Sequence, residues 1–149
     1  MGKQHSLTLP GRYGEIKRLC EFVGKGAAHS GFDEDAIFQI QLACDEACTN
    51  IVEHTYQEQD KGDITVNWEV QGSKFIVTIV DSGEQFDPDT IPPPSIPRPA
   101  LHVDDDLDVE VGGLGVHFMR ELMDKVSYSY RKGQGNVVTM VRQIPEKKR

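Results

Sequence analysis

The stretch DEACTNIVEH, at positions 45–54, limits most strongly what this chain can fold into. Together with the residues before it, it carries one apolar arc at helical spacing, made of Ile37, Ile40, Cys44, Ala47, Cys48, Ile51 and Val52. Glu46 and Asn50 are four residues apart, so a helix would point both side chains the same way, off this arc. The pattern predicts a helix with one face for a core and one face that holds a carboxylate beside a carboxamide.

Taken alone, Glu46 and Asn50 fit an ordinary solvated helix face, because polar residues on such faces are the norm. Two later motifs favour a functional site instead. Asp81-Ser82-Gly83 follows a strand-like apolar run, and Gly112-Gly113-Leu114-Gly115 precedes an amphipathic helix pattern. Three motifs in this order are far more specific than any one of them.

Size and charge narrow the function classes. A chain of 149 residues can form one domain with a real core. A formal net charge of -8 argues against binding to nucleic acid or to anionic membranes, which requires basic surface. No apolar run approaches the roughly 20 residues of a membrane span. Residues 1–5 show no signal-peptide segment.

The three cysteines, Cys20, Cys44 and Cys48, do not form the framework of a disulfide-rich secreted protein. Two of them lie in the apolar arc of the motif helix, so we expect all three to be small core residues. A reducing cytoplasm suits this composition.

Hydrophobic periodicity predicts alternating blocks of helix and strand. The expected elements, in chain order, are a strand around 7–9, a helix at 13–28, the motif helix from an N-cap at Asp33 to about Tyr56, strands at 64–70 and 75–80, a helix from about 116, and strands at 126–130 and 137–141. The strands at 64–70 and 75–80 read as a hairpin, and the second of them is buried and central. Helices on one face of a mixed, mostly antiparallel sheet give an α+β two-layer sandwich.

A long irregular segment lies at about 84–112. It is rich in proline between Ile91 and Pro99, which excludes a regular helix or a central strand, and rich in aspartate from Asp104 to Asp108. A loop of this length is usually a functional lid or disordered. A linker between two domains is the competing reading, but too few residues follow for a second core. We therefore expect a single domain over 1–149 with a Pro- and Asp-rich lid.

These motifs make the chain resemble the Bergerat-fold ATP-binding proteins, the superfamily of histidine-kinase-like ATPases. Glu46-x-x-x-Asn50 is similar to their N box, Asp81-x-Gly83 to their G1 box and Gly113-x-Gly115 to their G2 box. Within the superfamily, the stretch 46–54 and the segment Leu122-Met123-Asp124 look most like the bacterial anti-sigma-factor serine/threonine protein kinases. The resemblance covers nearly the whole chain.

The resemblance implies an adenine site around the G1 box. Asp81 ends a buried strand, where its carboxylate could accept a hydrogen bond from the adenine amine and reject guanine. Gly83 would let the backbone approach the base closely. Thr139 lies where the superfamily keeps a threonine near the adenine. The ordinary alternatives are an Asx turn at Asp81, a plain turn glycine at Gly83 and a β-forming residue at Thr139.

The other motifs would handle the triphosphate and Mg²⁺. Asn50 would supply an oxygen to Mg²⁺, and Glu46 would accept the proton of an attacking hydroxyl. His54, one turn further on, could contact phosphate or serve only the helix end. The G2 segment and the helix N-terminus after it would bind the phosphates through four residues: Gly113, Leu114, Gly115 and Val116.

The leading hypothesis is therefore an ATP-dependent protein serine/threonine kinase. By resemblance, it would hold a sigma factor inactive, phosphorylate an anti-sigma-factor antagonist and form a homodimer. A second hypothesis is a non-catalytic ATP-binding module that switches a partner in such a system. A third is a metal-dependent enzyme with Asp104–Asp108 as ligands, although consecutive aspartates are more often a solvated tract.

Overall fold

Five strands and two long helices make up the computed structural model, which describes residues 3–84, 119–132 and 135–146. Residues 119–122 are also helical. The elements run in the order β1 (His5–Pro10), α1 (Tyr13–His29), α2 (Glu34–Asn50), a π-helical turn η1 (Ile51–Thr55), β2 (Asp63–Gln71), β3 (Lys74–Asp81), β4 (Lys125–Arg131) and β5 (Gly135–Gln143). This is the order that the sequence predicts.

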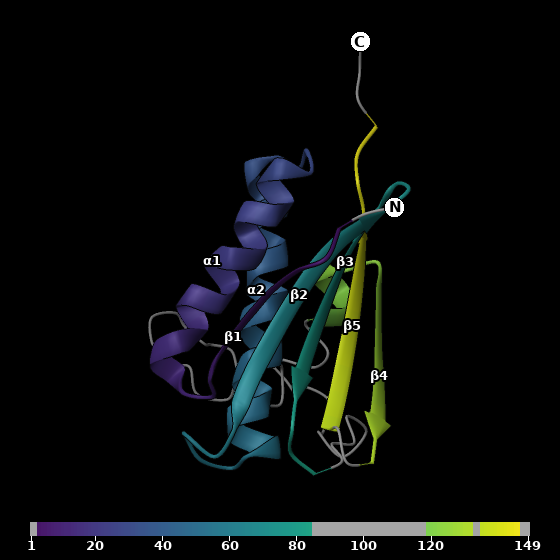
Figure 1. The fold of residues 1–149 in the computed structure, drawn as a ribbon. Helices are drawn as coiled ribbons and strands as arrows, with labels where there is room; N and C mark the ends of the chain where they lie inside the picture. Colours follow the sequence, from purple (N-terminus) through teal and green to yellow (C-terminus); the bar gives the residue numbers. More distant parts are fainter. Residues whose placement is uncertain (1–2, 85–118, 133–134, 147–149) are drawn as a thin grey trace, which may run out of the picture.

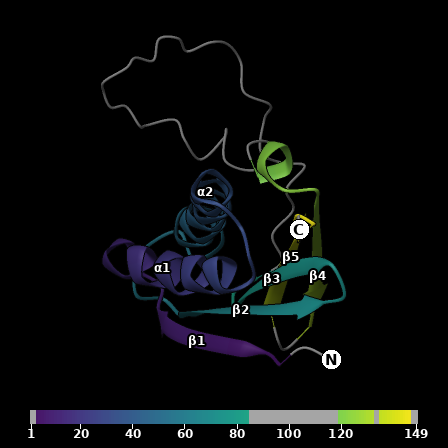
Figure 2. The same cartoon turned by 90° about the horizontal axis from the view of Figure 1, so that it is seen from above.

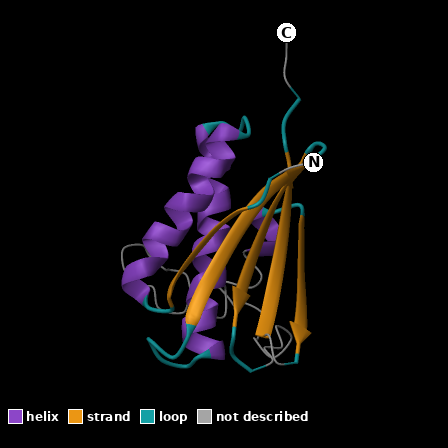
Figure 3. Cartoon of the chain, in the orientation of Figure 1, coloured by secondary structure: helices purple, strands orange, loops and turns teal. Residues whose placement is uncertain are grey.

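The sheet has the strand order β1-β2-β3-β5-β4, and every neighbouring pair is antiparallel. Figure 1 shows α1 and α2 together on one face of this sheet, and Figure 3 shows the same separation of helices from strands. The view from above in Figure 2 separates the two layers. The predicted α+β sandwich is confirmed, with the difference that the described strands form a fully antiparallel sheet rather than a mixed one.

Local sequence explains where the motif helix begins. The Asp33 side chain accepts a hydrogen bond from the backbone N–H of Ala36 at 2.9 Å, as the predicted N-cap requires. The predicted apolar arc supplies the buried side of α2. The three cysteines are buried free thiols and belong to the hydrophobic core. Both predictions are confirmed.

The central strand β3 points alternate residues into the core. Phe75, Val77 and Ile79 are buried beneath the helices, whereas Ile76 and Val80 face the other side and are half-buried. Because side chains alternate along a strand, Asp81 continues the buried row at the end of β3. The alternation of side chains along β3 therefore places the carboxylate of Asp81 at the edge of the core.

The motif helix does not continue as an α-helix to Tyr56. It changes at Asn50 into the π-helical turn η1, in which the Tyr56 N–H donates to the Ile51 carbonyl, five residues earlier, at 2.7 Å. Hydrophobic periodicity gives the same arc for either helix type over so short a stretch. A π turn inside a helix is frequently found at a functional site.

Gly135 allows the start of β5 to pack directly against the end of β3. Its φ angle is 112°, and an added Cβ would lie 1.8 Å from the Asp81 carbonyl oxygen. No other residue type fits there without moving the backbone of Asp81 or Ser82. The glycine thus permits the strand contact that places Asp81.

We predict that Gly135→Ala lowers the free energy of unfolding by roughly 4 kcal/mol or more, because backbone strain and a backbone clash add. Gly31→Ala is the matched control, since Gly31 has a φ angle of 105° and nothing within 4 Å of an added Cβ. Gly31→Ala should lower the free energy of unfolding only by the cost of the backbone strain, about 1–3 kcal/mol. Urea unfolding of both variants checks this, and equal costs would contradict the account.

Candidate functional site

A small cavity lies between the end of the motif helix, the end of β3, the middle of β4 and the start of β5. Its volume is about 20 Å³. The residues that line it are Ala47, Asn50, Ile51, Thr55, Ile79, Asp81, Tyr128, Asn136 and Val138. A cavity of this size holds about one water molecule, so a larger ligand would have to displace neighbouring groups.

Asn50 is the least satisfied polar residue of this cavity. The residue is 3% exposed, and neither its Nδ2 nor its Oδ1 has a hydrogen-bond partner among the described residues. A buried carboxamide without partners costs roughly 1–3 kcal/mol, so such a group calls for an explanation. The solvated-face reading is wrong for Asn50, whereas a polar ligand would supply what its amide lacks.

Glu46 lies one helical turn before Asn50 and is half-buried. Its Oε1 is buried, with no partner in the part of the chain that the structure describes. Burial, helped by the negative charges of Asp45 and Glu53, raises the pKa of Glu46 to about 7. A carboxylate with such a pKa has the basicity of an efficient general base at neutral pH.

Asp81 is 3% exposed and is held by three hydrogen bonds to one oxygen. Its Oδ1 accepts from the Gly83 N–H at 2.8 Å, from Asn136 Nδ2 at 2.9 Å and from the Asn136 N–H at 3.4 Å. The first bond is the Asx turn weighed above as the ordinary reading. Burial raises the pKa of Asp81, while the bonds from Asn136 and Gly83 oppose that rise.

Asn136 is a site residue that the sequence reading missed. Besides holding Asp81, its Nδ2 donates to the Glu84 carbonyl at 2.7 Å, which ties β5 to the segment after the G1 box. Only the pairing of β5 with β3 brings Asn136 to Asp81, and residues 55 apart give no local signal of that pairing. Its position directly after Gly135, at the start of a strand, is the one hint in the sequence.

Tyr128 was missed for the same reason. It lies on β4 opposite Val138, and both line the cavity. Burial, opposed by the charge of Arg120, raises the pKa of Tyr128 to about 12. Its hydroxyl therefore stays protonated at neutral pH.

Thr139 is not brought to the cavity. It pairs with Thr78, and the alternation along β5 turns its side chain away from the face that carries Asn136, Val138 and Met140. Its expected place near the adenine stays a prediction that the lining of the cavity does not support. The polar residue of β5 that reaches Asp81 is Asn136.

Gly83 has a structural reason to be glycine. An added Cβ would lie 2.4 Å from Thr55 Cγ2 and 3.2 Å from Tyr56 Cε1, so the G1 turn packs tightly on the end of η1. The expected contact with a base stays a prediction. His54 lies in η1, half-buried, and does not line the cavity.

The G2 residues Gly113, Leu114, Gly115 and Val116 lie outside the described residues, as do the acidic run and all of the expected lid except Glu84. Within the described ranges, no group of three or more His, Cys, Asp or Glu side chains is placed to hold a metal ion. None of the helices in those ranges is long and apolar enough to cross a membrane.

A wider hollow of about 500 Å³ lies between α1 and α2. Its lining includes Ile16, Cys20 and Leu42, and none of the predicted site residues. Size alone would favour this groove, but the buried carboxamide of Asn50 and the buried carboxylate of Asp81 both line the smaller cavity. We therefore take the smaller cavity as the functional site.

The fold and the cavity define an α+β domain whose polar groups converge under the end of one helix. A family model described as the histidine kinase-like ATPase domain matches residues 9–142. The chain belongs to this family. The resemblance inferred from the three sequence motifs is thereby confirmed.

Several relatives are named serine-protein kinase RsbW. The proteins from Bacillus velezensis and Bacillus subtilis are 35% and 34% identical over 107 residues, which is 72% of this chain and 66% of theirs. A protein from Listeria monocytogenes serotype 4a is 34% identical over 114 residues, 76% of this chain and 71% of its own. The chain thus spans just under two thirds of the length of the two Bacillus relatives.

We predict that Glu46 makes stability fall as pH rises. Its pKa is raised from 4.5 to about 7 in the folded chain, so the stability it contributes below 4.5 is lost as pH rises through about 7. The free energy of unfolding of the natural chain, minus that of Glu46→Gln, should fall as pH rises through this window and level off above it. Asp45 and Asp81 are present in both proteins, so their own contributions to the pH dependence cancel in this difference. A difference that is constant from pH 4.5 to 7.5 would contradict the raised pKa.

Proposed function

We propose that this protein is an ATP-dependent protein serine/threonine kinase whose site is the cavity under the end of α2. The observation that carries the proposal is the buried carboxamide of Asn50, which has no partner among the described residues and lies one turn from Glu46, in the same cavity as Asp81. The family, and relatives named serine-protein kinases, support the same activity.

The adenine would be bound at the Asp81 end of the cavity. The described hydrogen bonds to Asp81 all end on Oδ1, so Oδ2 is the oxygen that would accept the exocyclic amine of adenine. Guanine carries a carbonyl at that position and would leave a buried carboxylate facing an acceptor. Asn136 would keep the carboxylate ionised and correctly oriented.

Asn50 would hold Mg²⁺ through its Oδ1, with phosphate oxygens and water as the other ligands. The site fits such an ion because the neutral Oδ1 of Asn50 is buried there and has no partner in the part of the chain that the structure describes. When bound, Mg²⁺ would neutralise charge on the triphosphate. His54, Gly113, Leu114, Gly115 and Val116 are proposed to contact the phosphates.

In the transfer step, the hydroxyl oxygen of a substrate serine or threonine attacks the γ-phosphorus. The new O–P bond forms as the bond from the γ-phosphorus to the bridging oxygen breaks, and the electron pair leaves with ADP. Glu46 accepts the proton of the attacking hydroxyl. Its raised pKa makes it a stronger base than an exposed glutamate.

We further propose that the substrate is an anti-sigma-factor antagonist and that a sigma factor is the second partner, with the protein acting as a homodimer. These partners follow from the resemblance to anti-sigma-factor kinases. A cytoplasmic location is proposed with them and suits three reduced thiols.

Glu46→Gln should lower protein phosphorylation by 10²–10⁴-fold and leave ATP affinity within about tenfold, because it removes only the base. The assay incubates each purified variant with ATP, Mg²⁺ and a lysate of the native organism, and mass spectrometry then counts new phosphoserine and phosphothreonine. Glu34→Gln is the matched control: it makes the same change at an exposed glutamate in the first turn of the same helix and should keep the transfer.

Three outcomes separate the hypotheses. Phosphorylation that needs Glu46 supports the kinase. ATP binding without any phosphorylation leaves the non-catalytic switching module. Full phosphorylation by Glu46→Gln would show that Glu46 is not the base.

Asn50→Leu should separate stability from function. The Asn50 amide is buried and has no partner within the described ranges, so an apolar side chain of similar size should raise the free energy of unfolding by about 1–3 kcal/mol. The same change should abolish the dependence of ATP binding on Mg²⁺. Thermal unfolding and calorimetry with and without Mg²⁺ check both parts, and a destabilised variant that binds Mg²⁺–ATP normally would contradict the role of Asn50.

A further inference from the structure

Tyr56 joins the motif helix to the G1 turn through its hydroxyl group. The residue is 9% exposed and follows directly after η1. Its O–H donates to the Asp63 carbonyl at 2.7 Å, and its oxygen accepts from the Ser82 N–H at 2.9 Å. The Ser82 Oγ lies 3.2 Å from the same oxygen. One hydroxyl thus connects the helix end, the start of β2 and the turn that follows Asp81.

The ring of Tyr56 is enclosed by backbone. Added Cβ atoms at Gly11, Gly62 and Gly83 would each lie 3.2 Å or less from atoms of the Tyr56 ring or hydroxyl. These three glycines come from the β1–α1 junction, the start of β2 and the G1 turn. A side chain packed this closely on three segments has little freedom to move.

The π-helical turn sets the direction of Tyr56. Its N–H bonds to the Ile51 carbonyl five residues back, so the turn holds one more residue than an α-helical turn. That extra residue lets the chain keep Asn50 facing the cavity while Tyr56 faces the G1 turn.

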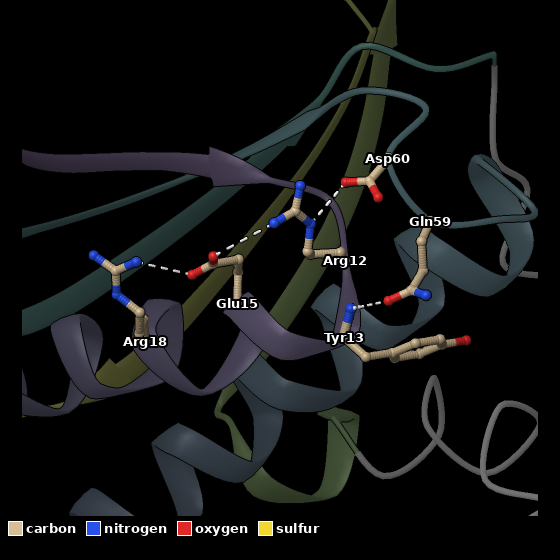
Figure 4. A network of polar contacts seen from close by, with 6 residues as sticks. All are labelled: Arg12, Tyr13, Glu15, Arg18, Gln59 and Asp60. Atoms are coloured by element: carbon tan, nitrogen blue, oxygen red, sulfur yellow. Dashed lines mark hydrogen bonds and ion pairs between the residues drawn. The ribbon is translucent and has the colours of Figure 1, made fainter.

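The loop after Tyr56 is tied to the start of α1 by hydrogen bonds of its side chains. Arg12 Nε donates to Asp60 Oδ1 at 2.7 Å, and the Tyr13 N–H donates to Gln59 Oε1 at 2.8 Å (Figure 4). Figure 4 also shows Arg12 and Arg18 flanking Glu15 on α1. These contacts fix the loop to the start of α1.

Backbone strain marks the same loop. Gln57 and Asp60 have φ angles of 66° and 64°, a region that non-glycine residues rarely adopt. Such conformations persist where the surrounding structure imposes them, and they cluster at ligand sites. The loop is therefore held in place by its contacts rather than by its own preference.

We propose that Tyr56 is a positioning residue for nucleotide binding: its hydroxyl fixes the Ser82–Gly83 turn, and through it Asp81, relative to the helix that carries Glu46 and Asn50. The inference rests on the proposed ATP site and extends it. Tyr56 touches neither the cavity nor the reacting groups among the described residues, so it acts only through the turn.

Tyr56→Phe removes the hydroxyl and keeps the ring. The Ser82 N–H then loses its acceptor, so its hydrogen exchange should accelerate by about tenfold or more, and ATP affinity should fall about tenfold. The transfer rate at saturating ATP should stay within roughly twofold, because the base is untouched. NMR hydrogen exchange on the full chain, calorimetry and steady-state phosphorylation supply the three readouts.

Tyr13→Phe is the matched control. It also removes a tyrosine hydroxyl that bonds to η1, through Glu53 Oε2 at 3.1 Å, but it has no contact with the G1 turn. It should leave both Ser82 exchange and ATP affinity unchanged. Slow exchange at Ala43, in the buried face of α2, shows that each variant is folded.

The outcomes distinguish this inference from the proposed function. Normal Ser82 exchange, or normal ATP affinity, in folded Tyr56→Phe would overturn the positioning role while the kinase proposal stands. Absence of ATP binding in the natural chain would overturn both. If Tyr56→Phe does not fold, Ser82→Ala removes only the 3.2 Å contact and should weaken ATP binding in the same direction; an unchanged affinity there would count against the role.

Discussion

The antiparallel contact between the end of β3 and the start of β5 is the constraint on which the site depends. It buries Asp81 at the rim of the core, and the glycine at position 135 allows the backbones to meet there. Asn136, the next residue, then satisfies the carboxylate that this contact has buried. Burying a charge is costly unless it is bonded in this way. The hydrogen bonds from Asn136 and Gly83 favour the ionised form, against the effect of burial, and they hold Oδ1 in a fixed direction.

The motif helix supplies the other half of the site, and the polar groups of that half lack hydrogen-bond partners among the described residues. Asn50 and Glu46 have buried polar atoms without partners among the described residues, which lowers the stability of the folded chain. Natural proteins tolerate such departures from good packing mainly at functional sites. The raised pKa of Glu46 has the same origin as the instability, since burial disfavours its charged form. At Asn50 and Glu46, the features that would serve the proposed chemistry therefore also lower the stability of the fold.

Much of this arrangement could be predicted from the sequence. Periodicity gave the order of the elements, the N-cap at Asp33 and the buried arc of the motif helix, because each is a local property. The π turn after Asn50 could not be predicted, since its extra residue leaves no mark on a short apolar pattern. Asn136 was missed and Thr139 was chosen in its place, because the register between β3 and β5 depends on pairing between distant segments. Local patterns were enough to identify the site residues on the motif helix. The contact of Asn136 with Asp81 depends on the pairing of distant strands.

The most direct test of the account is calorimetric titration of the natural chain and of Asp81→Asn with ATP and with GTP, in the presence of Mg²⁺. The account predicts saturable ATP binding to the natural chain, at least tenfold weaker binding to the variant and no binding of GTP to the natural chain. Folded natural protein that binds no ATP, or a variant that binds ATP as tightly as the natural chain, would contradict the assignment of the cavity as a nucleotide site.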